Sequence, residues 1–139
     1  RGLGDVYKRQ DYMRSDEEIE LVGMKLAMKF EREKGRVPED VASQNLGYDI
    51  RSSDPRDGYR YIEVKARAGR GSIALTPNEW LMAQRLGDEY WLYVVVNASK
   101  NPELHIIQNP AAKFKPDEEV SIVRYIVKNW SEEAERVDV

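Results

Sequence analysis

Two carboxylates and one lysine occupy positions from which paired strands would bring them together. Asp49 stands within residues 47–50, and Glu63 and Lys65 stand within residues 61–65. Both segments alternate polar and apolar residues, a pattern typical of half-buried strands. Glu63 and Lys65 therefore share one face of their strand, and Asp49 joins them there if the two strands pair. Two carboxylates beside an ammonium group can hold a hard cation and handle a proton.

The segment between these two strands favours a turn. Residues 51–58 are rich in Ser, Asp, Pro and Gly, which are the usual turn residues. We therefore predict a hairpin with strands over 47–50 and 61–65. A simpler interpretation of Glu63 and Lys65 is an ion pair on a solvated strand face, worth about 0–1 kcal/mol.

The pattern of Asp49, Glu63 and Lys65, D…ExK across adjacent strands, resembles the active site of the PD-(D/E)xK nuclease superfamily. A longer series of segments resembles the family named for the C-terminal domain of the plant protein NO VEIN. The segments that carry this resemblance are 47–50, 60–65, 75–80 and 90–95, and it extends over roughly residues 19–130. The fold that it implies is α/β, with a mixed central β-sheet flanked by helices, as in restriction endonucleases.

The superfamily resemblance also implies a chemistry. It implies a metal-dependent nuclease that hydrolyses phosphodiester bonds, with Mg²⁺ or Mn²⁺ held by Asp49, Glu63 and the carbonyl of Val64. Lys65 would orient the attacking water and stabilise the charge that develops. Two other functions stay open: a catalytically silent module that binds nucleic acid or protein, and a purely structural domain.

A further acidic residue is expected from the first helix. In related nucleases this helix often supplies an acid to the metal site, and Glu20 is the best match by its distance ahead of Asp49. Glu18 and Glu31 are alternatives for this role. Glu20 could also serve only the dipole of its helix.

Basic side chains gather around the same region. Residues 51–70 carry six Lys or Arg and three Asp or Glu, a local charge of +3. Local positive charge attracts phosphate whatever the net charge of the chain. We therefore expect a nucleic acid as the partner, and DNA in particular; the alternative is an ordinary solvated hairpin. The residues expected to contact it are Arg51, Arg60, Arg67 and Arg70, and, by resemblance to related nucleases, Gln84.

Capping patterns predict two helices. A capping box at residues 15–18 begins a helix over 16–34. Thr76 and Glu79 form a second box, with Pro77 between them, and begin a helix that ends near residue 86. Capping is the simpler role for Glu79, and we favour it over catalysis.

The remaining pattern predicts strands. Residues 90–96 form a nearly continuous apolar run, which is typical of a central strand buried on both faces. The other segments predicted as strands are 41–43, 72–75, 104–107 and 120–127. Residues 111–119 read as a polar loop.

Composition sets the outer limits. The chain has 139 residues, a net charge of -3 and no Cys. This length fits one domain, and the lack of Cys excludes a disulfide framework and a cysteine nucleophile. No run approaches the roughly 18 apolar residues of a membrane-spanning helix. A cytoplasmic protein without membrane contact is the expectation.

The ends of the sequence differ from its middle. Residues 1–10 resemble a translated sequencing adaptor, so we expect a non-native lead there and a single domain over 11–130. Residues 131–139 carry a charge of -3 and are expected to form an acidic tail. We expect the chain to be the C-terminal part of a larger DNA-processing or defence protein, with a helicase or ATPase domain ahead of it.

Overall fold

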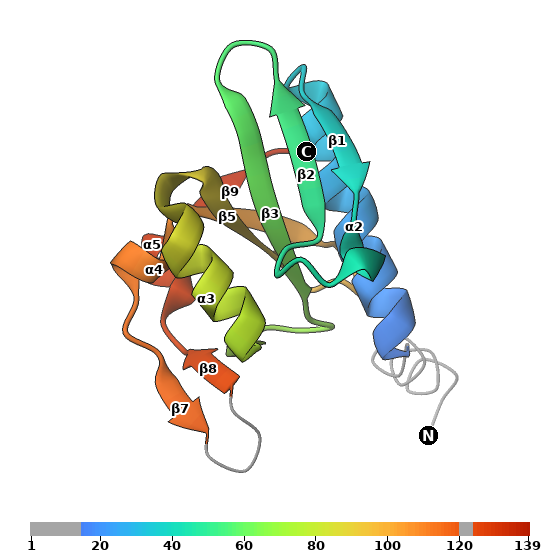
Figure 1. Ribbon diagram of the computed structural model, residues 1–139. Coiled ribbons are helices and arrows are strands. Elements are labelled where there is room, and N and C mark those ends of the chain that lie inside the picture. Colours follow the sequence, from blue (N-terminus) through green and yellow to red (C-terminus); the bar gives the residue numbers. More distant parts are fainter. Residues whose placement is uncertain (1–14, 120–123) are drawn as a thin grey trace, which may run out of the picture.

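The computed structural model describes residues 15–119 and 124–139, which form two sheets and the helices around them (Figure 1). The elements follow the chain in the order α2 (Asp16–Glu33), β1 (Val37–Asp40), η1 (Ala42–Gln44), β2 (Ile50–Asp54), β3 (Gly58–Ala66), β4 (Ile73–Leu75), α3 (Pro77–Leu86), η2 (Gly87–Glu89), β5 (Tyr90–Val96), β6 (Glu103–Gln108), α4 (Pro110–Lys113), β7 (Asp117–Glu119), β8 (Arg124–Val127), α5 (Trp130–Glu133) and β9 (Glu135–Val137). None of the helices within these described residues combines the length and the apolar run that a bilayer crossing needs.

The main sheet has six strands in the order β1-β2-β3-β5-β6-β9. The β3–β5 pair is parallel, and every other neighbouring pair in this sheet is antiparallel. Parallel neighbours need a crossover, and α3 lies within the connection between β3 and β5. A second sheet of three strands has the order β4-β8-β7. The predicted α/β architecture, a mixed sheet with flanking helices, is confirmed.

Each face of the main sheet is covered by a separate apolar core. On one side α2 contributes Ile19, Ala27 and Phe30 to a cluster with strand residues of the main sheet. On the other side lie α3, α4, α5 and the small sheet, and Figure 1 shows α3 and α2 on opposite sides. The central strand β5 is therefore buried on both faces, as predicted. Its residues divide between the cores, with Tyr93 and Val95 on the α2 side and Leu92, Val94 and Val96 on the other.

Helix α2 packs closely on β3 because one of its residues has no side chain. A Cβ built on Gly23 would lie 2.8 Å from the Cβ of Ala66. The helix begins at Asp16 with the hydroxyl of Ser15 accepting the N–H of Glu18, and it ends at Glu33. Its start agrees with the prediction, and its end lies one residue before the predicted position.

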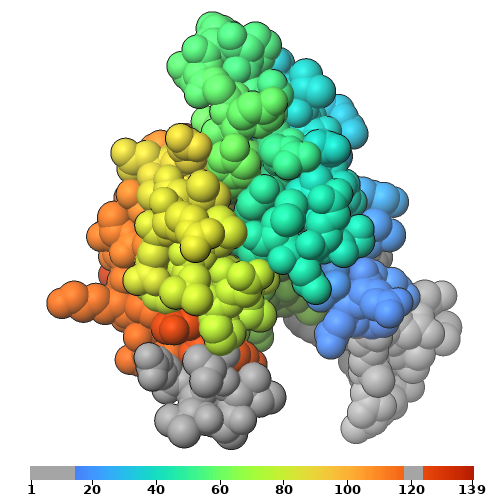
Figure 2. Space-filling view, in the orientation of Figure 1, coloured from blue at the N-terminus to red at the C-terminus, as the bar shows by residue number. Residues whose placement is uncertain are grey.

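The hairpin strands extend further toward the turn than the sequence predicts. Strand β2 covers Ile50–Asp54, so the strand predicted at 47–50 is wrong for residues 47–49, which precede β2. Residues 51–54 are strand, and only residues 55–57 form the turn. The reason is pairing on both edges of β2, with β1 on one side and β3 on the other. Such cross-strand pairing outweighs the local turn preference of Ser and Asp. The tip of this hairpin projects from the molecule in Figure 2.

The prediction of a strand at residues 41–43 is wrong. The strand comes earlier, as β1, and Ala42–Gln44 forms a 3₁₀ turn. The carboxylate of Asp40 accepts the N–H of Ala42, which turns the chain at that point. Residues 111–119 are not a continuous loop either, because they contain most of α4 and all of β7. Residues 72–75 do contain a strand, but β4 pairs with β8 in the small sheet.

The segment 131–139 lies against the domain. It contains most of α5 and all of β9, and β9 pairs with β6 at the edge of the main sheet. Val137 packs against the core on the α2 side. The expected lead, residues 1–10, lies outside the described residues, as does the first half of the strand predicted at 120–127.

Candidate functional site

Asp49 directly precedes β2 and is held against β3. Its N–H donates to the carbonyl of Ile62 over 2.8 Å, and its carboxylate accepts the N–H of Val64 over 2.9 Å. The Asp49 side chain therefore accepts a backbone N–H of β3 that would otherwise bond to a backbone carbonyl of a neighbouring strand. This fixes the Asp49 carboxylate beside the middle of that strand.

Glu63 and Lys65 face away from α2, as the alternation predicts. Ile62 and Val64 pack in the core on the α2 side, so the residues between and after them point to the other face. Glu63 is only 3% exposed, and the Lys65 Nζ lies 3.3 Å from its Oε2.

Glu79 completes this group from α3. The Lys65 Nζ donates to the Glu79 Oε1 over 2.8 Å, and the same oxygen accepts the N–H of Thr76 over 2.8 Å. The Thr76 hydroxyl in turn accepts the N–H of Glu79, so the predicted capping box is confirmed. Sequence reasoning favoured the cap over catalysis for Glu79 and missed its contact with Lys65. The available signal was the order of elements, since a helix that follows β3 and crosses to β5 must lie over β3.

Two clefts open at these carboxylates. One has a volume of about 270 Å³ and is lined by Glu20 and Met24 of α2 together with Asp49, Glu63 and Lys65. Glu20 is exposed, so its carboxylate is accessible at the rim. The structure therefore brings Glu20 to the same cleft as the three residues of the D…ExK pattern.

The second cleft lies between α3 and the segment that leads into β2. It has a volume of about 390 Å³, and Asp49, Glu63 and Glu79 line it as well as the first cleft. Its other wall includes Tyr48 and Asn78. In Figure 2 residues 42–49 and α3 lie side by side on this face. The carboxylate group is therefore reachable from two sides.

Burial raises the pKa of both central carboxyls. For Glu63 burial is the largest cause, and the nearby carboxylates of Asp49 and Glu79 add to it, so its pKa lies well above 4.5. Burial also raises the pKa of Asp49, although the Val64 N–H and the charge of Lys65 oppose the shift. Two adjacent carboxyls that resist ionisation favour a cation between them.

The pKa values of Lys65 and Glu79 shift in the directions expected of an ion pair. Burial alone would lower the pKa of Lys65, but the charges of Glu63 and Glu79 outweigh it and raise that pKa. Burial alone would raise the pKa of Glu79, but Lys65 and the Thr76 N–H lower it. Lys65 is therefore protonated at neutral pH.

The carboxylates offer an incomplete set of metal ligands. Within residues 15–119 and 124–139, no three His, Cys, Asp or Glu side chains are placed to hold one metal ion. Mg²⁺ commonly binds through one or two carboxylates and takes its other oxygens from water and phosphate. The half-buried Asp49 and the buried Glu63, both with pKa values raised by desolvation, fit such a partial site.

The residues predicted to contact nucleic acid lie in different places. Arg60 stacks over Trp91, with its Cζ 3.7 Å from the ring centroid, and donates to the Tyr93 hydroxyl over 3.0 Å. It therefore belongs to the α2 side of the sheet, opposite Lys65. The reason is the alternation along β3. Arg60 lies two residues before Ile62 and shares its face, whereas Glu63 points to the other face.

The other four are exposed or partly exposed. Arg51 pairs with Glu39 over 2.9 Å, and Arg70 pairs with Glu103 over 3.4 Å. Gln84 is exposed on α3 and lines neither cleft at the carboxylates. Arg67 comes directly after β3, two residues beyond Lys65, and donates to the Ser72 carbonyl over 2.8 Å. Arg51 and Arg67 each lie two residues along the chain from a residue of the candidate site, Asp49 and Lys65 respectively.

Glu31, an alternative to Glu20, has a different environment. It is fully buried and forms two bonds with Arg36, of 2.6 and 2.8 Å. The Tyr93 hydroxyl donates to the same carboxylate over 2.6 Å. Although burial would raise the pKa of Glu31, these partners lower it. Glu31 thus anchors α2 to β5, whereas Glu18, the other alternative, lies exposed in the first turn of α2.

Gly47 lets the segment before Asp49 approach α3. A Cβ at this position would lie 2.9 Å from the Met82 Cβ, and the backbone has φ of 86°. The hydroxyl of Tyr90 donates to the Gly47 carbonyl over 2.8 Å. The segment that leads into Asp49 is therefore held by Tyr90 of β5 and packs against Met82 of α3.

Comparison with known proteins identifies a family for this chain. No curated protein and no solved structure was found to match it. Residues 19–107 match the family model described as Protein NO VEIN, C-terminal, and this match runs from α2 into β6. More than half of the sequence lies within it, and the matched part contains Glu20, Asp49, Glu63, Lys65 and Glu79. The chain therefore belongs to the family of NO VEIN C-terminal domains.

Proposed function

We propose that this domain is a metal-dependent nuclease of the PD-(D/E)xK type with a restriction-endonuclease-like fold. The order of elements supports the fold: a helix, three antiparallel strands, a crossover helix and a strand parallel to the third. The observation that carries the function is the placement of Asp49, Glu63 and Lys65 at one open cleft. The substrate is a nucleic acid, with DNA as the first to test.

The carboxylates would hold the metal. Asp49 and Glu63 would bind Mg²⁺ or Mn²⁺, with the Val64 carbonyl as the remaining candidate ligand. When bound, such an ion supplies positive charge to the phosphate and lowers the pKa of a water. Glu20 lines the same cleft, where its exposed carboxylate would be available to the metal site.

Lys65 acts as a cation in this proposal. The carboxylates of Glu63 and Glu79 raise its pKa, so it stays protonated and cannot serve as a general base at neutral pH. Its ammonium group instead offers charge and hydrogen bonds to the phosphate oxygens as they become more negative. Hydrolysis adds the hydroxide part of water to phosphorus and its proton to the leaving oxygen. Glu79 is a positioning residue, because it fixes the Lys65 Nζ from α3.

A catalytically silent binding module is the second candidate. Two observations favour it: Lys65 already has two carboxylate partners, and the described residues hold no group of three metal-ligating side chains. In that case the clefts would bind a partner without cutting it.

Cleavage of labelled single- and double-stranded DNA and RNA in Mg²⁺, Mn²⁺ or EDTA separates the two candidates. The nuclease requires metal-dependent cutting that disappears in Asp49→Asn and in Lys65→Met. Asp57→Asn removes a carboxylate from the exposed hairpin turn and should leave cutting intact. Wild-type protein that never cuts, and whose melting temperature ignores both metals, would reject the nuclease and leave the silent module or a purely structural domain.

A further inference from the structure

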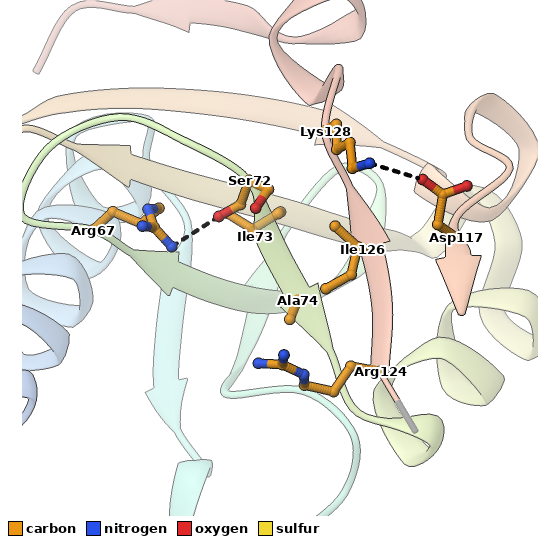
Figure 3. Close-up of a pocket in the computed structure, with 8 residues that line it drawn as sticks. All are labelled: Arg67, Ser72, Ile73, Ala74, Asp117, Arg124, Ile126 and Lys128. Atoms are coloured by element: carbon orange, nitrogen blue, oxygen red, sulfur yellow. Dashed lines mark hydrogen bonds and ion pairs between the residues drawn. The ribbon is translucent and has the colours of Figure 1, made fainter. Parts of the chain in front are cut away.

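A basic cleft lies beside the small sheet, away from the carboxylates. Its volume is about 370 Å³, and its charged lining consists of Arg67, Arg124, Lys128 and Asp117. Figure 3 shows Arg67 reaching it from the end of β3 and Arg124 reaching it from β8, while Lys128 turns toward Asp117. Among the residues that the structure describes, the lining thus carries three cations and one carboxylate.

The outer face of the small sheet forms the floor of this cleft. In β8 the residues at one parity, Tyr125 and Val127, pack into or against the apolar core. The residues at the other parity, Arg124 and Ile126, line the cleft, and Lys128 follows them at the same parity. Alternation in a short strand therefore places two cations on the open face of the sheet.

The cleft adjoins the candidate active site through β3. Glu63, Lys65 and Arg67 have the same parity along the chain, and Arg67 lies two residues, about 7 Å, beyond Lys65. The backbone of Arg67 is fixed by its N–H bond to the Val95 carbonyl and by the bond from the Ala98 N–H to its own carbonyl. One face of β3, continued by the residue that follows the strand, thus leads from the carboxylates to the basic cleft.

The loop that holds Arg67 is tied down. The Arg67 guanidinium donates to the Ser72 carbonyl over 2.8 Å and lies along Gly71, where a Cβ would come within 3.4 Å of its Nε. The Trp130 indole N–H donates to the Gly71 carbonyl over 2.9 Å. A guanidinium held in place loses less conformational freedom when it binds a phosphate.

We propose that the cleft between Arg67, Arg124 and Lys128 binds the phosphodiester backbone of a nucleic-acid strand that extends from the carboxylate site. Arginine suits this ligand because its planar group matches two phosphate oxygens. The ion pair between Lys128 and Asp117 spans 3.5 Å, and both side chains are more than 70% exposed, so Lys128 can exchange this partner for a phosphate. The inference rests on the proposed function for the choice of a nucleic acid as ligand.

Binding is measured in EDTA, so that cutting cannot occur. Fluorescence anisotropy of labelled single-stranded DNA at several salt concentrations gives the affinity and its salt dependence. Arg67→Gln and Lys128→Gln should each weaken binding several-fold and reduce the slope of log affinity against log salt by about 0.7. Arg67→Lys keeps the charge and should retain most of the slope. Melting temperatures show whether each variant is folded.

The matched control is Arg56→Gln, which makes the same charge change on the exposed hairpin turn outside the cleft. It should leave both affinity and slope unchanged. Equal losses in Arg56→Gln and the cleft variants would overturn the proposal, because net charge alone would then explain binding. Wild-type protein that binds polyglutamate as tightly as DNA through the same residues would overturn it in favour of an acidic protein partner.

The experiments distinguish a failure of the proposed binding cleft from a failure of the proposed nuclease activity. Binding that depends on Arg67 and Lys128, without any cutting in Mg²⁺ or Mn²⁺, supports the cleft and rejects the nuclease. Cutting that is lost in Asp49→Asn but unaffected by the cleft variants supports the nuclease and rejects the cleft. Asp49→Asn should bind DNA in EDTA at least as well as wild type, because it removes a negative charge from the path of the strand.

Discussion

The Lys65 Nζ lies 2.8 Å from the Glu79 Oε1, and this contact ties β3, the parallel neighbour of β5, to the first turn of α3. The same ammonium group is 3.3 Å from the Glu63 Oε2. The Glu79 oxygen also caps its helix through the Thr76 N–H. The start of α3 and the position of the Lys65 ammonium are therefore fixed together, and a change in one must affect the other.

Glu79→Gln tests this coupling. A glutamine can still accept the Thr76 N–H, but it cannot compensate the Lys65 charge, which is largely buried. We expect the free energy of unfolding to fall by about 1.5–3 kcal/mol, the usual range for a hydrogen bond to a charged group. Urea denaturation measures it. Glu33→Gln removes one partner of an exposed pair with Lys29 and should cost less than about 0.5 kcal/mol. Equal costs would mean that the contact with Lys65 adds nothing.

Glu63→Gln should change how stability depends on pH. Glu63 has a pKa in the folded protein that lies well above the 4.5 of an unfolded glutamate. Its contribution is therefore fully present below pH 4.5 and is lost as the pH rises through the folded pKa. In EDTA, wild type should lose stability relative to Glu63→Gln over this window. Lys65 stays protonated over this pH range. The loss of its Glu63 partner in the variant therefore changes the free energy of unfolding by an amount that does not depend on pH.

Urea denaturation across that pH range gives both curves. Parallel curves would show that Glu63 ionises as readily in the folded protein as in the unfolded chain. Asp49→Asn is a useful comparison, because burial raises the pKa of Asp49 in the same direction. The difference in the free energy of unfolding between wild type and Asp49→Asn should change with pH in the same direction.

Glu31→Gln should be among the most destabilising single changes. It leaves the Arg36 charge, whose side chain is 8% exposed, without its bidentate partner, and we expect a loss of about 3–5 kcal/mol. The pKa of Glu31 is lowered in the folded protein, so its contribution is present above pH 4.5 and is lost as the pH falls through the folded pKa. Thermal melts at neutral and acid pH check both statements. Glu39→Gln, in the exposed pair with Arg51, should shift the melt little.

Gly47→Ala should destabilise the protein more than Gly58→Ala. Both glycines have positive φ, of 86° and 84°, so an alanine at either pays about 1–2 kcal/mol in backbone conformation. A Cβ at position 58 meets nothing within 4 Å, whereas at position 47 it meets the Met82 Cβ at 2.9 Å. The difference in urea midpoints measures the cost of packing alone. Equal midpoints would mean that the approach of this segment to α3 is loose.

The sequence by itself determined the parts that depend on local periodicity and local capping. Alternation placed Glu63 and Lys65 on one face of β3, and the apolar run predicted that β5 is buried on both sides. The capping boxes located the starts of α2 and α3. Each of these follows from residues within one or two turns or a few strand positions, where the physical preference is already in the chain.

Only the tertiary structure decided which distant residues meet. Glu79 joins Lys65 because the crossover from β3 to β5 lays α3 over the sheet, and β9 becomes an edge strand because β6 offers free backbone groups. Arg67 and Arg124 come to one cleft through the pairing of β4 with β8. These contacts join residues far apart in the sequence, and no local pattern specifies the register or the crossover that brings them together.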